Sequence, residues 1–263
     1  MIAQSMGGVV GGVFKHQFPQ WVKGPARIEG DEIVLDEERA EPYYIHGPEN
    51  LFTDLASLVP SRPDFRSQDA VRFVRHHGLL WHGPEAVGRG DVREALNDWW
   101  QAGARLSILI RLYQRLLEGV RTGSAEPIRS LGYRFPRITG SEQWGDDEYG
   151  LMMASGMLAG FINDRLANCS HAIAAGCGFQ GEDGEPLADP GVFFYDVQPP
   201  NLESAAYAHL AGLMVVRAEI KECPGCGRPF TPTSGKQKYH STSCGSTTRG
   251  RRFREKQSDE EPK

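Results

Sequence analysis

The sequence lacks a hydrophobic run long enough to cross a membrane. Its longest apolar stretch covers residues 150–162, and charged side chains bound it on both sides. A transmembrane helix needs about 20 consecutive apolar residues. The first residues also lack the leading positive charge of a signal peptide. We therefore expect a cytoplasmic protein without a membrane partner, and a buried core helix at residues 150–162.

Cysteine is scarce as well. The chain has five cysteines, and an odd number without framework spacing excludes a secreted disulfide scaffold. Cys169 and Cys177 stand apart, whereas the other three lie close together near the C-terminus. The spacing of those three is typical of metal ligands and not of disulfides.

Recognisable catalytic motifs are absent too. His76, His77 and His82 lie close in sequence, but neighbouring positions on a helix point apart and no HExxH pattern is present. The glycine-rich residues 7–12 follow no strand and lack a P-loop lysine. We therefore assign no catalytic residue and favour a protein that is not an enzyme. An enzyme or toxin-type effector with a site assembled from distant residues of 1–220 stays an alternative.

The chain does have enough apolar side chains for a packed core, and its charge is uneven. Its 263 residues are 40% hydrophobic and 10% aromatic, which excludes a disordered chain. The formal net charge is −5, yet residues 221–256 hold nine Lys and Arg against two acids. That segment carries about +7, which leaves about −12 on the remainder. A basic end on an acidic protein indicates contact with a polyanion such as nucleic acid.

Hydrophobic periodicity and turn residues predict a mainly α protein with a small β element, an α+β fold. A hairpin is expected at residues 26–36, with its turn at Gly30. Ser67 and Asn201 are expected to cap helices, and Gly78 to end the first of them. Helices are expected at residues 50–59, 67–78, 91–118, 146–174 and 201–220, and a strand at 192–197.

The helix predicted at residues 91–118 carries an apolar seam with steps of three and four residues. Glu94 stands three residues after Asp91 and completes a capping box at the helix start. The seam suits a bundle helix packed within its own domain, and it also suits a homodimer formed through this helix. Paired opposite charges beside the seam would favour the dimer, and they are sparse, so we favour the bundle. The seam comprises Val92, Leu96, Trp99, Gly103, Leu106, Ile110, Tyr113 and Leu117.

Four residues near the C-terminus have the spacing of a metal site, namely Cys223, Cys226, His240 and Cys244. Two residues between the first pair allow a tight knuckle in which both sulfurs face one metal. We expect the second pair to lie four positions apart on one helix, and therefore on the same face. Three thiolates and an imidazole complete a tetrahedral set with no open position for water. The prediction is therefore one structural Zn²⁺ and not a catalytic one.

Residues beside the ligands have supporting roles in this prediction. Gly227 frees the backbone just after the second sulfur, and Ser241 caps the helix that carries Cys244. Phe230 and Tyr239 supply the small apolar core that such a finger needs.

A basic helix follows the last ligand. Arg249, Arg252 and Lys256 are expected to share one face, and such a stripe suits a row of phosphates. The alternative is a solvated tail, or a patch that docks on the acidic remainder of the protein. The residues expected to contact nucleic acid are Arg228, Lys236, Lys238, Arg249, Arg251, Arg252, Arg254 and Lys256.

Around these residues the sequence reads CxxCGxxF and then YHSxxCGSTTRGRRFR. It resembles the treble-clef finger of the bacterial CGNR zinc-finger proteins, many of which are described as transcription regulators. The family has Asn and Arg where Ser246 and Thr247 follow Gly245, and it usually has a third cysteine in place of His240. The resemblance covers the C-terminal finger and implies a treble clef with DNA contact through the basic helix. Residues 73–80 resemble uncharacterised bacterial helical domains, which implies no activity.

These patterns lead to one hypothesis on domains and function. We expect a zinc-binding and DNA-binding regulator whose large domain senses a signal or mediates self-association. The alternatives are the enzyme named above and a protein–protein interaction module stapled by zinc. The expected domains are a hairpin and short-helix region at 1–65, a helical domain at 66–220 that forms one unit with it, the finger with its basic helix at 221–257, and a disordered tail at 258–263.

Overall fold

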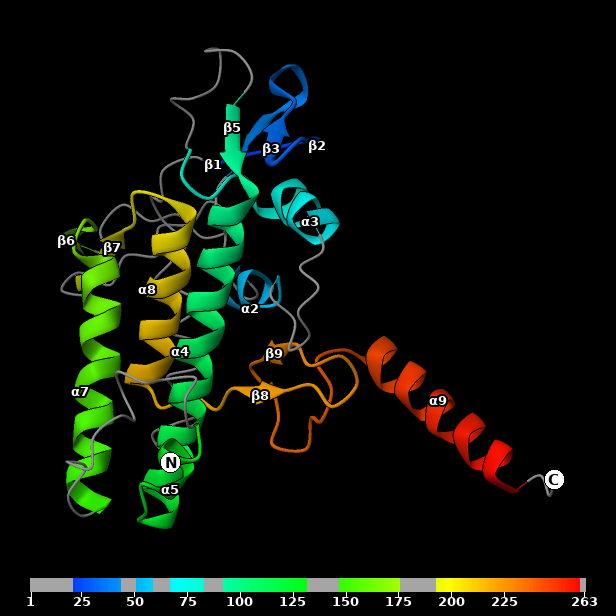
Figure 1. The fold of residues 1–263 in the computed structure, drawn as a ribbon. Helices are drawn as coiled ribbons and strands as arrows, with labels where there is room; N and C mark the ends of the chain where they lie inside the picture. The colour runs from blue at the N-terminus through cyan, green and yellow to red at the C-terminus, as the bar shows by residue number, and fades with distance from the viewer. Residues whose placement is uncertain are drawn as a thin grey trace. The chain divides into compact units, whose positions relative to one another are not determined.

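The computed structural model describes residues 21–43, 51–58, 67–82, 92–131, 147–175 and 193–260 (Figure 1). These residues are mainly helical with short antiparallel sheets, as the predicted α+β class requires. The chain divides into two compact units, of which the first holds residues 1–52, 66–102 and 159–212 and the second holds 53–65, 103–158 and 213–263. The predictions for residues 1–20, 50, 59, 91, 146, 176–192 and 261–263 lie outside the described residues.

Small antiparallel sheets belong to the first unit. The hairpin predicted at residues 26–36 is confirmed, and Gly30 turns it with a φ of 60°, a conformation that favours glycine. The strand predicted at residues 192–197 is also present. The paired strands are β1 (Trp21–Lys23) with β4 (Glu41–Tyr43), β2 (Ala26–Glu29) with β3 (Glu32–Leu35) and then β5 (Val92–Ala95), and β6 (Ser170–Ala175) with β7 (Phe193–Gln198).

Strand β5 shows that the predicted start of the helix at residues 91–118 is wrong, because α4 (Leu96–Thr122) begins only at Leu96. Buried and exposed side chains alternate along β5, which is the period of a strand. Arg93 bridges two glutamates of the neighbouring hairpin, at 2.9 and 3.2 Å. Sheet pairing therefore overrides the capping-box pattern, and Glu94 lies in the core instead of capping the helix.

Helix α3 (Ser67–His77) ends as predicted at Gly78, which has a φ of 89°. A Cβ at this glycine would clash with the carbonyl oxygen of Val22. Phe73 packs edge-on against Trp99, with ring centroids 5.3 Å apart. Further buried side chains complete this apolar core of the first unit: Trp21, Val22, Ile33, Val34, Leu35, Val74, Leu79 and Leu80.

Helix α7 (Asp147–Leu166) is shorter than the helix predicted at residues 146–174. Residues 170–175 form β6 instead, because all six pair with β7 in an antiparallel ladder. One side of α7 is buried, in a four-residue step through Gly150, Ala154, Leu158 and Ile162. The other sides are exposed and include Met152, Met153 and Phe161, so the prediction of a buried core helix holds for one side only.

Asn201 caps α8 (Leu202–Val215) as predicted, and its side-chain oxygen accepts a hydrogen bond from the Ser204 amide at 2.8 Å. This helix ends at Val215, before the predicted end near residue 220. The remaining described elements are η1 (Glu37–Arg39), α2 (Leu51–Ala56), α5 (Glu126–Arg129), β8 (Lys221–Glu222), β9 (Pro229–Phe230) and α9 (Thr242–Glu260).

The apolar seam of the long helix is buried within a single copy of the chain. Trp99, Leu106, Ile110 and Tyr113 are each at most 3% exposed. This burial favours the bundle interpretation over a dimer formed through the seam. Among the described residues, every helix is too short or too polar to span a bilayer.

Candidate metal centre

The first two ligands lie on a tight hairpin between β8 and β9, which pair antiparallel. The Cys223 amide donates to the Arg228 carbonyl at 2.9 Å, and the Gly227 amide donates to the Cys223 carbonyl at 2.8 Å. Gly227 has a φ of 76°, as expected of a glycine that frees the backbone after the second sulfur. The hairpin therefore presents Cys223 and Cys226 from one compact turn.

The other two ligands lie at the start of α9. Ser241 caps this helix as predicted, because its hydroxyl accepts a hydrogen bond from the Cys244 amide at 3.1 Å. Cys244 lies in the first turn of α9, whereas His240 lies before the helix begins. The expectation that both share one helical face is therefore wrong, and the loop before α9 positions the imidazole.

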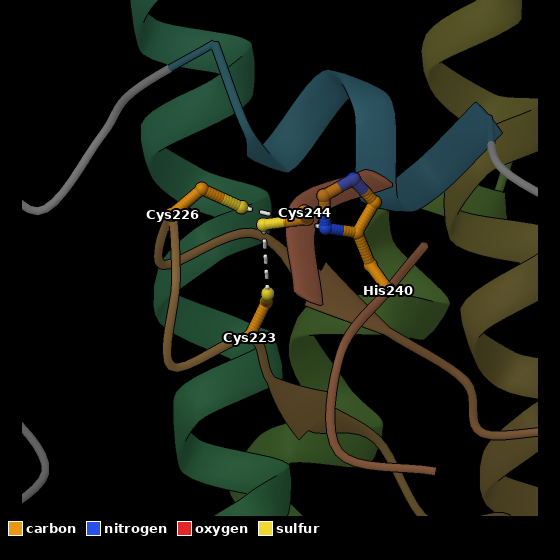
Figure 2. A group of neighbouring side chains, drawn as sticks. All are labelled: Cys223, Cys226, His240 and Cys244. Carbon is orange, nitrogen blue, oxygen red and sulfur yellow. Dashed lines mark hydrogen bonds between the residues drawn. The ribbon is translucent and has the colours of Figure 1, made fainter. Parts of the chain in front are cut away.

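All four side chains converge on one point (Figure 2). Their ligand atoms lie within 4.8 Å of one another. The Cys223 and Cys244 sulfurs are 3.5 Å apart, and the Cys226 sulfur is 3.4 Å from His240 Nδ1. Two thiolates on one tetrahedral Zn²⁺, each about 2.3 Å from the ion, lie about 3.8 Å apart, so the spacing suits a shared ion. The group could coordinate one metal ion.

The thiols of this group do not ionise equally. Burial raises the pKa of Cys223, but hydrogen bonds from His240 and from nearby backbone amides outweigh it and lower the pKa to about 6. Burial raises the pKa of Cys244 to about 11, with the neighbouring Cys223 and Cys226 sulfurs as a further cause. One thiolate is therefore tolerated and three repel one another, and a bound divalent cation would remove this repulsion.

Close packing holds the ligands in place. A Cβ on Gly225 would lie 2.8 Å from the Cys244 sulfur and would also clash with the Thr248 hydroxyl. Tyr239 lies against Gly245, where a Cβ would be 3.1 Å from its ring, and Phe230 is buried. Phe230 is therefore buried as predicted, and the half-buried Tyr239 packs against the start of α9.

Helix α4 and Asp54 contact residues 218–228, which lead into the hairpin and form most of it, within the second unit. The Tyr113 hydroxyl donates to the Ala218 carbonyl and the Gln114 amide to the Ile220 carbonyl, both at 2.9 Å. Burial raises the pKa of Tyr113 to about 12, so its hydroxyl keeps its proton and acts as a donor. Arg228 forms an ion pair with Asp54 at 3.3 Å. The hairpin is therefore held by contacts outside its own sequence.

The residues predicted to contact nucleic acid have different surroundings. Arg228 is half-buried against Asp54, so it supports the hairpin. The structure does not describe the side chains of Arg252 and Lys256. The others are exposed around the metal centre and along α9: Lys236, Lys238, Arg249, Arg251 and Arg254.

The first unit holds a polar cluster that local sequence patterns do not predict. The buried carboxylate of Glu94 accepts hydrogen bonds from the amides of Leu80 and Trp81, at 3.0 and 2.8 Å, and lies 2.9 Å from His82 Nδ1. The Trp81 indole donates to Glu203 at 3.1 Å. The sequence offers one signal for this cluster, namely a glutamate in a segment where apolar and polar residues alternate. A strand explains this pattern as well as a capping box does.

Comparisons with protein-family models, with curated proteins and with solved structures find no match to this chain.

Proposed function

We propose that Cys223, Cys226, His240 and Cys244 bind one structural Zn²⁺ in a treble-clef finger of the CGNR type. Three sulfurs and one imidazole nitrogen are a donor set that zinc prefers, and four protein ligands leave no position for a reacting water. The hairpin followed by a capped helix supports the treble clef. The ion would stabilise the finger and would do no chemistry.

We propose further that the finger and α9 bind DNA in a regulatory protein, and that α9 contacts the phosphates. The observation that carries this proposal is the exposure of five basic side chains on a segment with a charge of about +7. Zinc would fix the start of α9 and so direct its arginines toward one partner. Phosphate contacts of this kind give salt-dependent affinity that depends little on sequence.

A titration of duplex DNA against salt tests this proposal. Replacing Arg249, Arg251 and Arg254 together by alanine is expected to flatten the slope of log K against log salt by about three. A matched control replaces three exposed arginines elsewhere, Arg39, Arg72 and Arg121, and is expected to bind as the wild type does. Absence of binding at low salt, or equal loss in both triple variants, would refute DNA binding by α9.

The contacts of the hairpin favour a second candidate, a zinc-stapled protein interaction module. Arg228 is engaged by Asp54, and Tyr113 and Gln114 hold the chain before the first ligand. Zinc could then serve only to fix this segment within the second unit. Partner binding that requires the finger and survives nuclease treatment would favour this candidate over DNA binding.

A further inference from the structure

The exposed side of α9 supports an inference about the form of nucleic acid, and this inference rests on the proposed DNA binding. The first turns of α9 bury Gly245 and Thr248 and half-bury Cys244 on the side of the metal centre. Residues three, four and seven positions apart share one face of a helix. The opposite face, called here the small-residue face, is exposed and comprises Ser243, Ser246, Thr247 and Gly250.

Arginines flank the small-residue face on both sides. Arg249 borders one side, and its guanidinium lies 3.3 Å from the Ser246 hydroxyl. Arg251 borders the other side, whereas Arg254 follows Gly250 by four positions and continues the small-residue face itself; both are exposed. Phe253 follows one turn after the small residues and is 63% exposed, so its ring belongs to no apolar core. Small side chains in the middle, cations at both edges and one exposed aromatic ring therefore share this part of α9.

We propose that α9 lies in the major groove of duplex DNA with its small-residue face toward the base edges. This groove is about 12 Å wide and admits an α-helix. Ser, Thr and Gly side chains allow the helix backbone to approach the bases closely, and a residue without a Cβ at Gly250 allows the closest approach. The arginines at the two edges then reach phosphates on both sides of the groove.

Phe253 has a defined partner in this arrangement. It lies at the edge of the small-residue face, where its ring meets the base edges. The apolar group that the major groove exposes is the methyl group of thymine. Phe253 is therefore a specificity-determining residue that favours thymine.

The same features disfavour other nucleic acids. The major groove of duplex RNA is deep and narrow, and protein side chains do not read it. Proteins that hold single strands stack successive bases on several aromatic side chains. Helix α9 contains one aromatic residue, Phe253, in its 19 residues. Duplex DNA is the partner that fits.

Substitutions at Gly250 test the groove contact with the full-length chain and a DNA duplex of alternating A·T pairs. Gly250→Leu is expected to lose about tenfold or more in affinity, because its side chain blocks the approach to the base edges. Gly250→Ala is expected to bind within a few-fold of the wild type. Gly156→Leu places the same side chain at another open helical glycine and is the matched control. Unchanged zinc content in each variant verifies that the finger is folded.

Replacing thymine by deoxyuridine in that duplex tests the role of Phe253. The wild type is expected to bind the methyl-free duplex more weakly, whereas Phe253→Ala is expected to bind both duplexes equally. An RNA duplex and a single strand of thymidines complete the comparison, and both are expected to bind more weakly than duplex DNA.

The outcomes separate this inference from the proposed function. If the wild type binds duplex DNA but Gly250→Leu binds equally well, α9 does not enter the groove and only the inference is overturned. Equal or stronger binding of the single strand or of duplex RNA overturns it as well. If the wild type binds no nucleic acid at low salt, the proposed DNA binding itself fails.

Discussion

The metal centre of the second unit and the Glu94 cluster of the first unit both gather acidic groups, but they stabilise them differently. Around Glu94, two backbone amides and one imidazole surround a single carboxylate at 2.8 to 3.0 Å. In the metal centre, three sulfurs face one another and ionisation of one raises the pKa of another. The Glu94 cluster therefore has its hydrogen-bond donors within the protein, whereas the metal centre is a group that could coordinate a metal ion.

This difference implies that the two regions respond to different perturbations. Removal of metal should affect the finger and leave the first unit intact. Loss of one buried carboxylate should affect the first unit and leave metal binding intact. Hydrogen bonds stabilise the charged group in the first unit, and under the proposed function a zinc ion would stabilise the thiolates in the second.

The largest expected effect is that of metal removal. Chelation, or Cys226→Ser, should abolish protection of amides in residues 221–260, because structural zinc contributes on the order of 10 kcal/mol to folding of such segments. Amides of β3 and β5 should keep their protection. Hydrogen exchange followed by mass spectrometry measures both regions at once. Equal protection of residues 221–260 with and without metal would contradict the expectation that the finger folds only with a bound metal.

Removal of the Glu94 carboxylate should have the next largest effect. Glu94→Ala leaves the amides of Leu80 and Trp81 without their acceptor, which should cost about 3 kcal/mol in the free energy of unfolding. Chemical denaturation of the zinc-loaded protein measures it, with Glu118→Ala as a control at an exposed carboxylate on α4. Zinc stoichiometry should stay unchanged. A loss below about 1 kcal/mol would show that the Glu94 hydrogen bonds do not hold the first unit together.

A smaller effect is expected for a methyl group added beside the ligands. Gly225→Ala places a Cβ 2.8 Å from the Cys244 sulfur, so the ligand must shift. Zinc affinity should fall by roughly tenfold, as is common when groups that orient a ligand are altered. Gly235→Ala lies in the same finger with open space around the new Cβ, and it should leave the affinity unchanged. Competition with a chromophoric chelator measures both, and equal affinities would show that the packing does not position Cys244.

The smallest effect concerns an exposed carboxylate of the second unit. The Ala125 amide donates to Asp147 at 3.0 Å and lowers the carboxyl pKa below 3.8, with Arg129 as a further cause. A lowered pKa in the folded state stabilises the fold above the unfolded pKa, and this stabilisation is lost as the pH falls through the folded value. The stability advantage of wild type over Asp147→Asn should therefore shrink below about pH 3.8. An NMR titration of this carboxyl group with a midpoint at or above 3.8 would contradict the lowered pKa of Asp147.

The sequence was most informative where partners lie close together along the chain. The ligands Cys223 and Cys226, the cap at Ser241 and the glycine end of α3 all involve residues a few positions apart. Local spacing is enough to predict such features, because the geometry of a turn or of one helical turn fixes them.

The sequence was least informative where distant segments decide the structure. Glu94 fitted a capping box, but pairing of β5 with β3 placed it in a strand. Residues 170–175 continued an apolar pattern, but pairing with β7 made them a strand. The Arg228–Asp54 ion pair joins residues 174 positions apart, and spacing could not predict it. Strand pairing overrides the local pattern at the first two places, and the ion pair has no local pattern that could predict it.

The metal content of the full-length protein tests the central claim most directly. The protein is purified without added metal, beside Cys226→Ser, and its zinc is measured by elemental analysis. We predict one equivalent of zinc per chain in the wild type and far less in the variant. A wild-type protein without zinc, or a variant that retains the full equivalent, would contradict the claim that these four residues form a structural zinc site.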